Sequence, residues 1–419
     1  NEAEKDLIVY FQYRFEENFD SFSKLRKGVV HNDANENNII VSEDLLQPEV
    51  VTIIDYGDAI YTQVVNDLAI ACAYGIMHHN DVLEASLPIV KGYHSSFPLQ
   101  EVELVHLYDA IAMRLVISVT KSAINKIKEP DNGYLVTSEK PAWEVLKKWH
   151  SIPADFALYS FRQACGFTAH PNEMAFKEWM NDQKLSLAAL FPTIQKNDIQ
   201  PLDLSVSSTW IGHENEFNDL DLFQYKINKL QSQHPEKIIA GGYLEPRPIY
   251  TSSSFDKIGN YGTASRSIHL GIDFWLAAQT PVHALFDGEV VVSYNNAGPK
   301  LYGGLLVLKH QIENFAFYTL YGHLSIDSVS NKRVGDTIKK GTCIGYLGNK
   351  KENGNWVPHL HFQIMLSLLN FKNDFPGVAD FNEIAVWKSI CPDPHLMFKV
   401  NGLQATAVIS NRDLINYRK

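Results

Sequence analysis

The sequence predicts a multidomain α and β protein, in which a mostly α region is followed by a mainly antiparallel β domain. Three observations support this fold class. A chain of 419 residues is too long for one ordinary hydrophobic core, so two or three domains are expected. Helical spacing of apolar residues dominates up to about residue 185. After about residue 245, short apolar runs lie between glycine-containing turns, which is typical of all-β domains.

The composition is that of an ordinary globular protein and excludes some partners. The formal net charge is -11, which argues against nucleic-acid binding because phosphate contacts need a basic face. No apolar run approaches the roughly 20 residues of a membrane-spanning helix, and no secretory signal is visible. The four cysteines lie far apart, which favours reduced thiols (Cys72, Cys165, Cys343 and Cys391). We therefore expect a cytoplasmic protein without nucleic-acid or membrane partners. The chain begins at Asn1, which leaves a longer native N-terminus open.

The N-terminal region is expected to open with a helix, because apolar residues recur at spacings of three and four. The members of this stripe are Ile8, Phe11, Phe15, Phe19 and Phe22. Two short β-type runs follow, at 38–41 and 50–54. Further helices are expected at 64–80, 100–127, 140–150, 155–165 and 172–185.

Residues 186–245 have no dominant period and are expected to connect two domains, with one short strand at 204–209. The β domain is expected over 246–375, with strands at 282–286, 289–294, 305–310, 315–321, 343–347 and 359–366. Residues 376–419 carry no recognisable chemical motif. The predicted organisation is therefore 1–185, 186–245, 246–375 and a tail over 376–419.

A first polar constellation surrounds residue 31. His31, Asp33 and Asn38 have the form H-x-D-x-x-x-x-N before a strand, and Asp55 directly follows the next β run. Phosphoryl transfer needs a carboxylate that orients the attacking hydroxyl and oxygen ligands for Mg²⁺. Asp33 suits the first role, and Asn38 with Asp55 suits the second. The alternative is a polar turn, because Asp and Asn favour turns.

Both motifs together resemble the catalytic and metal-binding loops of aminoglycoside phosphotransferase-type kinases, and most of all the hydroxylysine kinase branch. Asp67 matches a structural aspartate of that family. The resemblance implies a mostly α kinase-like C-lobe over 1–185, with Asp33 as catalytic residue and Asn38 and Asp55 as magnesium ligands.

Two features depart from that kinase pattern. Asn32 stands where the family usually has glycine, and the roughly 30 residues before His31 read as a helix instead of a nucleotide-holding lobe. We therefore expect this chain to phosphorylate nothing by itself. Mg²⁺ and ATP are expected only if the missing N-lobe is restored.

A second constellation lies between residues 269 and 361. His269 and Asp273 form an H-x-x-x-D pair, His323 follows Tyr321–Gly322, and His359 and His361 form an H-x-H pair. Zinc prefers imidazole nitrogen and carboxylate oxygen, and a hydrolytic site keeps three protein ligands and one open position. On a strand, side chains two residues apart share a face, so the last two histidines point to the same side.

These motifs resemble the lysostaphin/LytM-type metallopeptidases, which cut peptide bonds in peptidoglycan. The resemblance covers about 245–370 and includes the scaffold phrases 284–290 and 334–341. It implies that His269, Asp273 and His361 bind Zn²⁺. It also implies that His323 and His359 flank the metal-bound water and the substrate carbonyl, in an order that stays open.

One departure from the metallopeptidase pattern lies just before the H-x-H pair. The usual small, glycine-containing run is here Asn353–Val357. Trp356 in that run is expected to add bulk near the cleft.

The order of the two halves resembles bacterial fusions of a kinase-like region, this peptidase and a class III aminotransferase. The chain is then expected to be a middle fragment, with an adjoining aminotransferase domain in the full-length protein. Three functions follow as alternatives. One is a zinc endopeptidase acting on a peptide or muropeptide. Another is a component of a small-molecule kinase, and the third is a non-catalytic scaffold in a multienzyme fusion.

Overall fold

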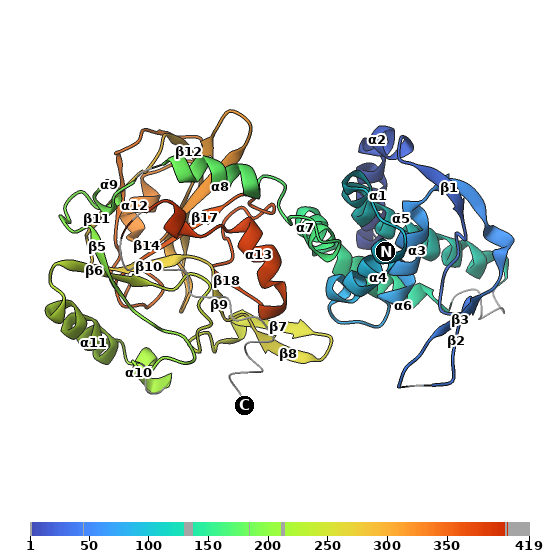
Figure 1. Cartoon of the computed structure of the whole chain (residues 1–419), viewed down its shortest axis with the longest axis horizontal. Coiled ribbons are helices and arrows are strands. Elements are labelled where there is room, and N and C mark those ends of the chain that lie inside the picture. The colour runs from blue at the N-terminus through green and yellow to red at the C-terminus, as the bar shows by residue number, and fades with distance from the viewer. Residues whose placement is uncertain are drawn as a thin grey trace. The chain divides into compact units, whose positions relative to one another are not determined.

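The computed structural model describes residues 2–44, 46–129, 137–183, 185–210, 214–398 and 400, which form two compact units (Figure 1). Of the described residues, those within 1–169 and 258–262 form the first unit, and those within 170–257 and 263–400 form the second. The first is mostly helical, and the second contains a large sheet, so the predicted α and β class is confirmed.

The first unit is a helical bundle around one long central helix. Its helices are α1 (Glu2–Glu17), α2 (Phe19–Ser23), α3 (Val65–Gly75), α4 (Val82–Ser96), α5 (Glu101–Lys128), α6 (Glu139–His150) and α7 (Ala154–Ala164). Helix α5 packs against α1, α3, α6 and α7. Trp149 is fully buried there, stacks on Tyr108 and donates its indole N–H to the Tyr108 carbonyl at 3.1 Å. The bundle core therefore depends on aromatic packing with a satisfied polar edge.

Two details of this bundle differ from the sequence prediction. The predicted first helix is broken between α1 and α2, so Phe11 and Phe22 are buried whereas Phe19 is 51% exposed. Helix α4 was not predicted, because Pro88 and Gly92 within it are helix-breaking signals.

The strands of the first unit form two small antiparallel pairs. Strand β1 (Lys27–Val30) pairs with β4 (Ile60–Gln63), and β2 (Ile39–Val41) pairs with β3 (Val50–Ile53). The β2–β3 pair confirms the two predicted β runs. The short helical turn η1 (Tyr56–Asp58) lies between β3 and β4.

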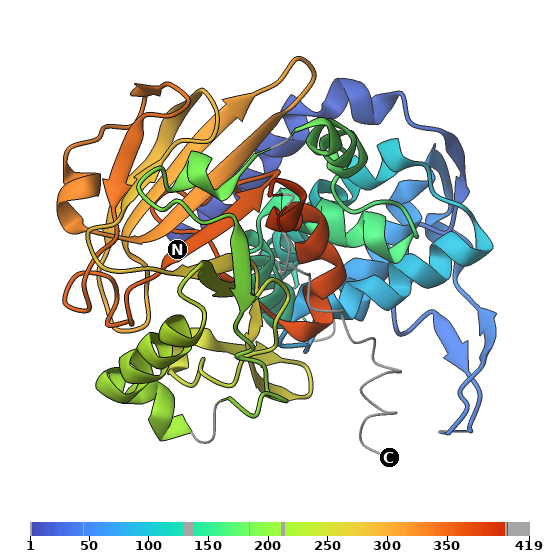
Figure 2. The ribbon, with the colours of Figure 1, turned by 60° about the vertical axis from the view of Figure 1, so that its left-hand side comes forward.

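The second unit is built on an eight-stranded sheet in the order β15, β12, β13, β14, β17, β10, β6, β5. These strands are β5 (Asp198–Pro201), β6 (Lys237–Gly241), β10 (Ile272–Trp275), β12 (Gly288–Asn296), β13 (Gly303–Gln311), β14 (Ala316–Leu324), β15 (Thr337–Ile338) and β17 (Leu360–Met365). All neighbours are antiparallel except β5 and β6. The long strands β12, β13 and β14 lie side by side in Figure 2. The predicted mainly antiparallel β domain is confirmed.

Shorter elements surround this sheet. The strand pairs are β7 (Asp256–Gly259) with β8 (Gly262–Ser265), β9 (Ile268–His269) with β18 (Val378–Ala379), and β11 (Pro281–His283) with β16 (Cys343–Tyr346). The remaining helices and helical turns are α8 (Glu173–Asp182), α9 (Leu187–Leu190), α10 (Glu214–Asn218), α11 (Leu220–Gln233), α12 (Ile326–Ser330), α13 (Ile384–Ile390), η3 (Ser253–Phe255), η4 (Phe381–Glu383) and η5 (Pro394–Leu396).

The segment between residues 170 and 245 is an integral part of the second unit. In helix α8, Phe176 contacts Phe317 and Trp179 contacts Phe286, with ring centroids 5.3 and 5.4 Å apart. Strands β5 and β6 extend the main sheet, and α11 packs against β6 (Figure 1). The strand predicted at 204–209 is wrong, because the chain forms turns and bends there, and the strand lies at 198–201. The compact unit thus begins at His170, before the predicted division at residue 185.

Residues 376–398 also pack onto the second unit. Strand β18 pairs with β9, and the Leu366 amide donates to the Ile390 carbonyl at 2.8 Å. Phe398 contacts Phe274 and Phe362 of the sheet. The first part of the predicted tail therefore closes the β unit, whereas residues 401–419 lie outside the described residues.

Among the helices in the described ranges, none combines the length and the apolar character that crossing a bilayer requires.

Candidate functional site

Three strands bring the predicted zinc ligands together. Asp273 on β10 is the direct cross-strand neighbour of His361 on β17. Such neighbours project from the same face of a sheet. His269 ends the short strand β9, which pairs with β18. All three side chains are at most 3% exposed.

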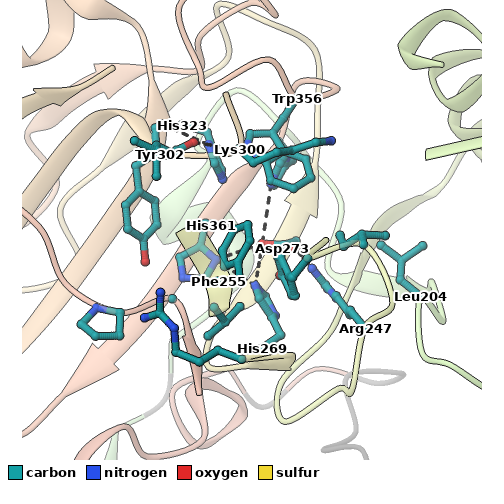
Figure 3. A pocket seen from close by; sticks show the side chains of 18 of the residues that line it. Leu204, Arg247, Phe255, His269, Asp273, Lys300, Tyr302, His323, Trp356 and His361 are labelled. Carbon is teal, nitrogen blue, oxygen red and sulfur yellow. Dashed lines mark hydrogen bonds and ion pairs between the residues drawn. The ribbon is translucent and has the colours of Figure 1, made fainter. Parts of the chain in front are cut away.

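The ligand atoms of these three residues converge on one point. His269 Nε2 lies 2.9 Å from His361 Nδ1, and Asp273 Oδ1 lies 3.4 and 3.2 Å from these two nitrogens. Zinc–ligand bonds of about 2.0–2.1 Å in tetrahedral geometry imply ligand separations of about 3.3 Å. The triangle therefore has the size of one face of a zinc tetrahedron (Figure 3).

Outer contacts assign the protons of the two imidazoles. His269 Nδ1 lies 2.8 Å from the Gly242 carbonyl oxygen, and His361 Nε2 lies 2.9 Å from Gln363 Oε1. Because these oxygens accept, each imidazole carries its proton on the outer nitrogen. The two inner nitrogens and the Asp273 carboxylate then direct lone pairs at one another, which favours a cation between them.

The outer oxygen of Asp273 is held by a buried arginine. Arg247 Nη1 donates to Asp273 Oδ2 at 2.6 Å, and Arg247 Nε donates to Glu245 Oε2, also at 2.6 Å. Glu245 Oε1 in turn accepts the Leu204 amide at 2.9 Å. Arg247 and Glu245 are each 3% exposed. This chain of contacts keeps Asp273 Oδ1 directed at the two histidines.

The two remaining histidines stand beside the cluster with their outer nitrogens bound. His323 Nδ1 lies 3.0 and 2.9 Å from the carbonyl oxygens of Tyr302 and Asn353, and His359 Nδ1 lies 2.6 Å from that of Val357. Both therefore carry the proton on Nδ1 and leave the Nε2 lone pair free. The ring centroids are 4.3 Å apart, and His359 Nε2 is 3.8 Å from Asp273 Oδ1.

The backbone around the cluster leaves little spare room. A Cβ atom at Gly271 would lie 2.7 Å from His361 Cε1, so the middle of the H-x-x-x-D motif must be glycine. His323 has φ of 63°, a left-handed conformation that is costly for a residue with a side chain. Strain of this kind is concentrated at functional sites.

Burial favours the neutral form of three histidines of the site, namely His269, His323 and His359. It lowers the pKa of His269 to about 3 and holds the pKa of His323 well below its usual value. Burial also lowers the pKa of His359. For Asp273, burial opposes ionisation, but the charged Arg247 beside it outweighs burial and keeps the pKa well below the usual range. At neutral pH the site thus offers free imidazole lone pairs and one carboxylate.

A cavity of about 280 Å³ opens onto these five residues. Its wall is mostly apolar, with Phe223, Phe255 and Trp275 among the lining residues. Trp356 lines it as expected from its place in the sequence, and Lys300 lies over its ring (Figure 3).

The kinase-like site is arranged differently. Asn38 Nδ2 lies 3.1 Å from Asp33 Oδ2, so the structure brings these two predicted residues together. The other carboxylate oxygen of Asp33 accepts from Arg114 Nη2 at 2.6 Å. Asp55 is exposed and accepts from the Gly57 amide at 3.3 Å. Among the described residues, no hydrogen bond or ion pair joins Asp55 to Asp33 or Asn38, although the neighbouring Ile54 amide donates to the Asn38 carbonyl at 2.9 Å.

Asn32 fits its position in that loop. Its φ is 65°, and its amide donates to Asp67 Oδ1 at 3.0 Å. Asparagine is the non-glycine residue that most readily adopts a left-handed conformation. The replacement of the family glycine therefore preserves the loop and its contact with the predicted structural aspartate.

Sequence reasoning missed the outer residues of the metal cluster. The sequence could have indicated Gln363, because its position two residues after His361 places it on the strand face that His359 and His361 share. Arg247, Glu245 and Lys300 carry no such signal, because they come from irregular segments that only folding brings to the site.

Comparison with known proteins assigns a family to each region. Residues 267–372 match peptidase family M23, and residues 5–95 match the phosphotransferase enzyme family. The chain thus carries an M23 peptidase domain behind a phosphotransferase-family segment.

Similar proteins are found for both regions. The chain is 36% identical over 106 residues to glycyl-glycine endopeptidase ALE-1 of Staphylococcus capitis, which covers 25% of this chain and 26% of that protein. It is 39% identical over 140 residues to lysostaphin of Staphylococcus staphylolyticus, with 32% and 27% covered. It is 28% identical over 127 residues to hydroxylysine kinase of Danio rerio, with 30% and 36% covered. The chain therefore spans only about a quarter to a third of the length of these relatives.

Proposed function

We propose that the second unit is a zinc-dependent metallopeptidase of the lysostaphin/LytM type, which hydrolyses peptide bonds in peptidoglycan-like or other small peptides. The observation that carries this proposal is the convergence of His269 Nε2, His361 Nδ1 and Asp273 Oδ1 within 3.4 Å. The M23 family match and the likeness to a glycyl-glycine endopeptidase support it.

The donor set fits zinc. Two imidazole nitrogens and one carboxylate oxygen are the ligand types of hydrolytic zinc sites, which keep a further position open for water. The carbonyl of Gly242 and the amide of Gln363 hold the two ligand histidines from outside, as is usual at such sites. We assign His269, Asp273 and His361 as the zinc ligands.

The other two histidines are assigned to proton transfer. A zinc ion supplies a Lewis acid that lowers the pKa of bound water to about 7. His323 and His359 each present an unprotonated Nε2 toward the cavity, so either can accept a proton and pass it to the leaving amine. The imidazole that has taken up a proton at Nε2 can then donate it in a hydrogen bond to the developing oxyanion. The apolar cavity excludes water and strengthens these electrostatic contacts.

The test is metal analysis of the purified chain together with a cleavage screen on glycine-rich peptides and muropeptides. We expect one zinc per chain and cleavage that a chelator abolishes and added zinc restores. Zinc at these ligands with tight peptide binding and no hydrolysis would favour the scaffold alternative. Absence of zinc from the chain would contradict the proposal.

For the first unit, the phosphotransferase-family match and the likeness to hydroxylysine kinase favour a small-molecule kinase origin. We propose that this chain does not phosphorylate hydroxylysine, because Arg114 pairs with Asp33, the predicted catalytic carboxylate. ATP-dependent phosphorylation of hydroxylysine by the purified chain would contradict this.

Two further assignments belong to the same proposal. All four cysteines are free, which supports work in a reducing compartment such as the cytoplasm. There a recycled muropeptide or another short peptide is the substrate that we propose. An adjoining aminotransferase domain in the full-length protein stays a prediction.

A further inference from the structure

One lysine of the cavity wall has no counterion. Lys300 lines the cavity, and its Nζ lies 3.9 Å from the centroid of the Trp356 ring. Among the described residues no carboxylate pairs with it. Of the other two lining cations, Arg247 pairs with Asp273 and Glu245. Arg266 has no carboxylate partner among the described residues, but it donates a hydrogen bond to the Ser254 carbonyl at 2.6 Å. A partly buried ammonium without a partner is costly unless a ligand supplies the anion.

The backbone holds Lys300 in this place at a cost. Its φ is 65°, a left-handed conformation that a lysine rarely adopts. Its amide donates to the Gly354 carbonyl at 2.8 Å, and Trp356 Nε1 donates to the Leu301 carbonyl at 3.2 Å. A Cβ atom at Gly354 would lie 1.9 Å from the Leu301 carbonyl oxygen. These two hydrogen bonds connect the loop that carries Lys300 to the loop that carries Trp356 and hold the two side chains against each other.

Trp356 connects this lysine to the proposed proton-transfer residues. Its ring lies edge-on to His359, with centroids 6.2 Å apart, and 6.0 Å from the ring of His323. Lys300 therefore stands one ring away from the place where a peptide bond would be cut, above the metal-ligand cluster in Figure 3. These distances place Lys300 Nζ within about 10 Å of both imidazoles. An extended peptide advances roughly 3.5 Å per residue, so this position lies within about three residues of the cleaved bond.

From these contacts we propose that Lys300, held over Trp356, binds a carboxylate of the peptide substrate next to the cleaved bond. This inference rests on the proposed peptidase function and narrows its substrate class to short peptides that carry a carboxylate there. The carboxylate is either a free C-terminus or an acidic side chain, because both present the same two oxygens to the ammonium. The electron-rich face of Trp356 attracts the ammonium and holds it in this position, 3.9 Å from the ring centroid.

The experiment compares three acetylated oligoglycine peptides with the zinc-loaded full chain. The first has a free C-terminal carboxylate, the second a C-terminal amide, and the third a C-terminal amide next to one glutamate. A charge-assisted contact predicts that kcat/KM is about tenfold higher for a carboxylate-bearing peptide than for the amide. A preference for the first peptide identifies a chain terminus, and a preference for the third identifies an acidic side chain.

Three variants test whether Lys300 causes the preference for carboxylate-bearing peptides. In Lys300→Met the carboxylate-to-amide ratio should fall to about one, and in Lys300→Arg it should persist because the charge remains. Lys351→Met is the matched control, since Lys351 is an exposed lysine of the neighbouring turn, and it should keep the wild-type ratio. Zinc content and near-ultraviolet circular dichroism establish that each variant is folded. An unchanged ratio in Lys300→Met would overturn the inference, because the carboxylate would then be bound elsewhere, for example by the metal.

A binding measurement keeps the inference testable if no peptide is cut. Calorimetric titration of the chelator-treated chain with the same three peptides should show about tenfold tighter binding of a carboxylate-bearing peptide, and Lys300→Met should abolish the difference. Lack of cleavage with this binding difference present would contradict the peptidase proposal alone. Equal binding of all three peptides by the wild-type chain would overturn the role of Lys300.

Discussion

The metal-type cluster of the second unit and the kinase-like loop of the first each contain an aspartate that pairs with an arginine, but the second carboxylate oxygen is used differently. At Asp273, an arginine takes the outer carboxylate oxygen and leaves the inner one for a metal. At Asp33, Arg114 donates to one carboxylate oxygen, and Asn35 and Asn38 donate to the other, so both oxygens already accept hydrogen bonds from the protein. A motif is therefore a working site only where the surrounding contacts leave its lone pairs free and directed at one point.

The largest expected effect is on zinc content and peptide cleavage when one motif residue of either region is replaced by alanine. His361→Ala removes a ligand atom, so zinc content should fall from one per chain to near zero. Peptide cleavage should fall at least about 1000-fold, because the metal contributes several kcal/mol. Asp33→Ala, in the other unit, should leave zinc content and cleavage at wild-type values. Metal analysis and kcat/KM on one peptide measure both, and equal losses in the two variants would refute the separation of the sites.

The two arginines give a second comparison. Arg247→Met leaves two buried carboxylates without their partner, so we expect about 3–5 kcal/mol of lost stability and about 10–100-fold weaker zinc binding. Arg114→Met should cost only about 1 kcal/mol, because Asp33 and Arg114 are 23% and 16% exposed and water can replace the contact. Urea unfolding measures the loss of stability, and competition with a chelator measures the zinc affinity. Similar costs for both arginines would show that burial does not distinguish them.

A third prediction uses the pH dependence of the proposed carboxylate contact. Burial lowers the pKa of Lys300 to about 8. The ammonium that binds a carboxylate is therefore present below this pH and lost above it. The preference for carboxylate-bearing peptides should fall from about tenfold to about one as the pH rises through and beyond 8. In Lys300→Arg it should persist to pH 10, since the guanidinium stays charged.

The smallest expected effect is on the free energy of unfolding when Asn32, the left-handed residue of the kinase-like loop, is replaced. Asn32→Gly should change the free energy of unfolding by less than about 0.5 kcal/mol, because both residues tolerate this backbone. Asn32→Val should cost about 1–2 kcal/mol through the clash of its branched side chain. Urea denaturation measures both. A large loss in the glycine variant would mean that the asparagine side chain itself stabilises the loop.

Much of the fold could be read from residue periodicity. The strands β12, β13, β14 and β17 and the helices α3, α5, α6 and α7 lie within a few residues of their predicted ranges. Helix α4 was not predicted because Pro88 and Gly92 normally interrupt a helix, and tertiary packing outweighs that tendency here. The strand at 198–201 was missed because it pairs in parallel with β6 through backbone contacts that no local pattern encodes.

By itself, the sequence determined which residues can bind a metal and that His359 and His361 share one strand face, because side-chain alternation is a local property of the backbone. Only the tertiary structure decided that Asp273 lies opposite His361, that Arg247 holds its outer oxygen, and that Lys300 remains unpaired over Trp356. These contacts join segments that are far apart along the chain. They depend on strand register and loop packing, which the folded core fixes through long-range contacts.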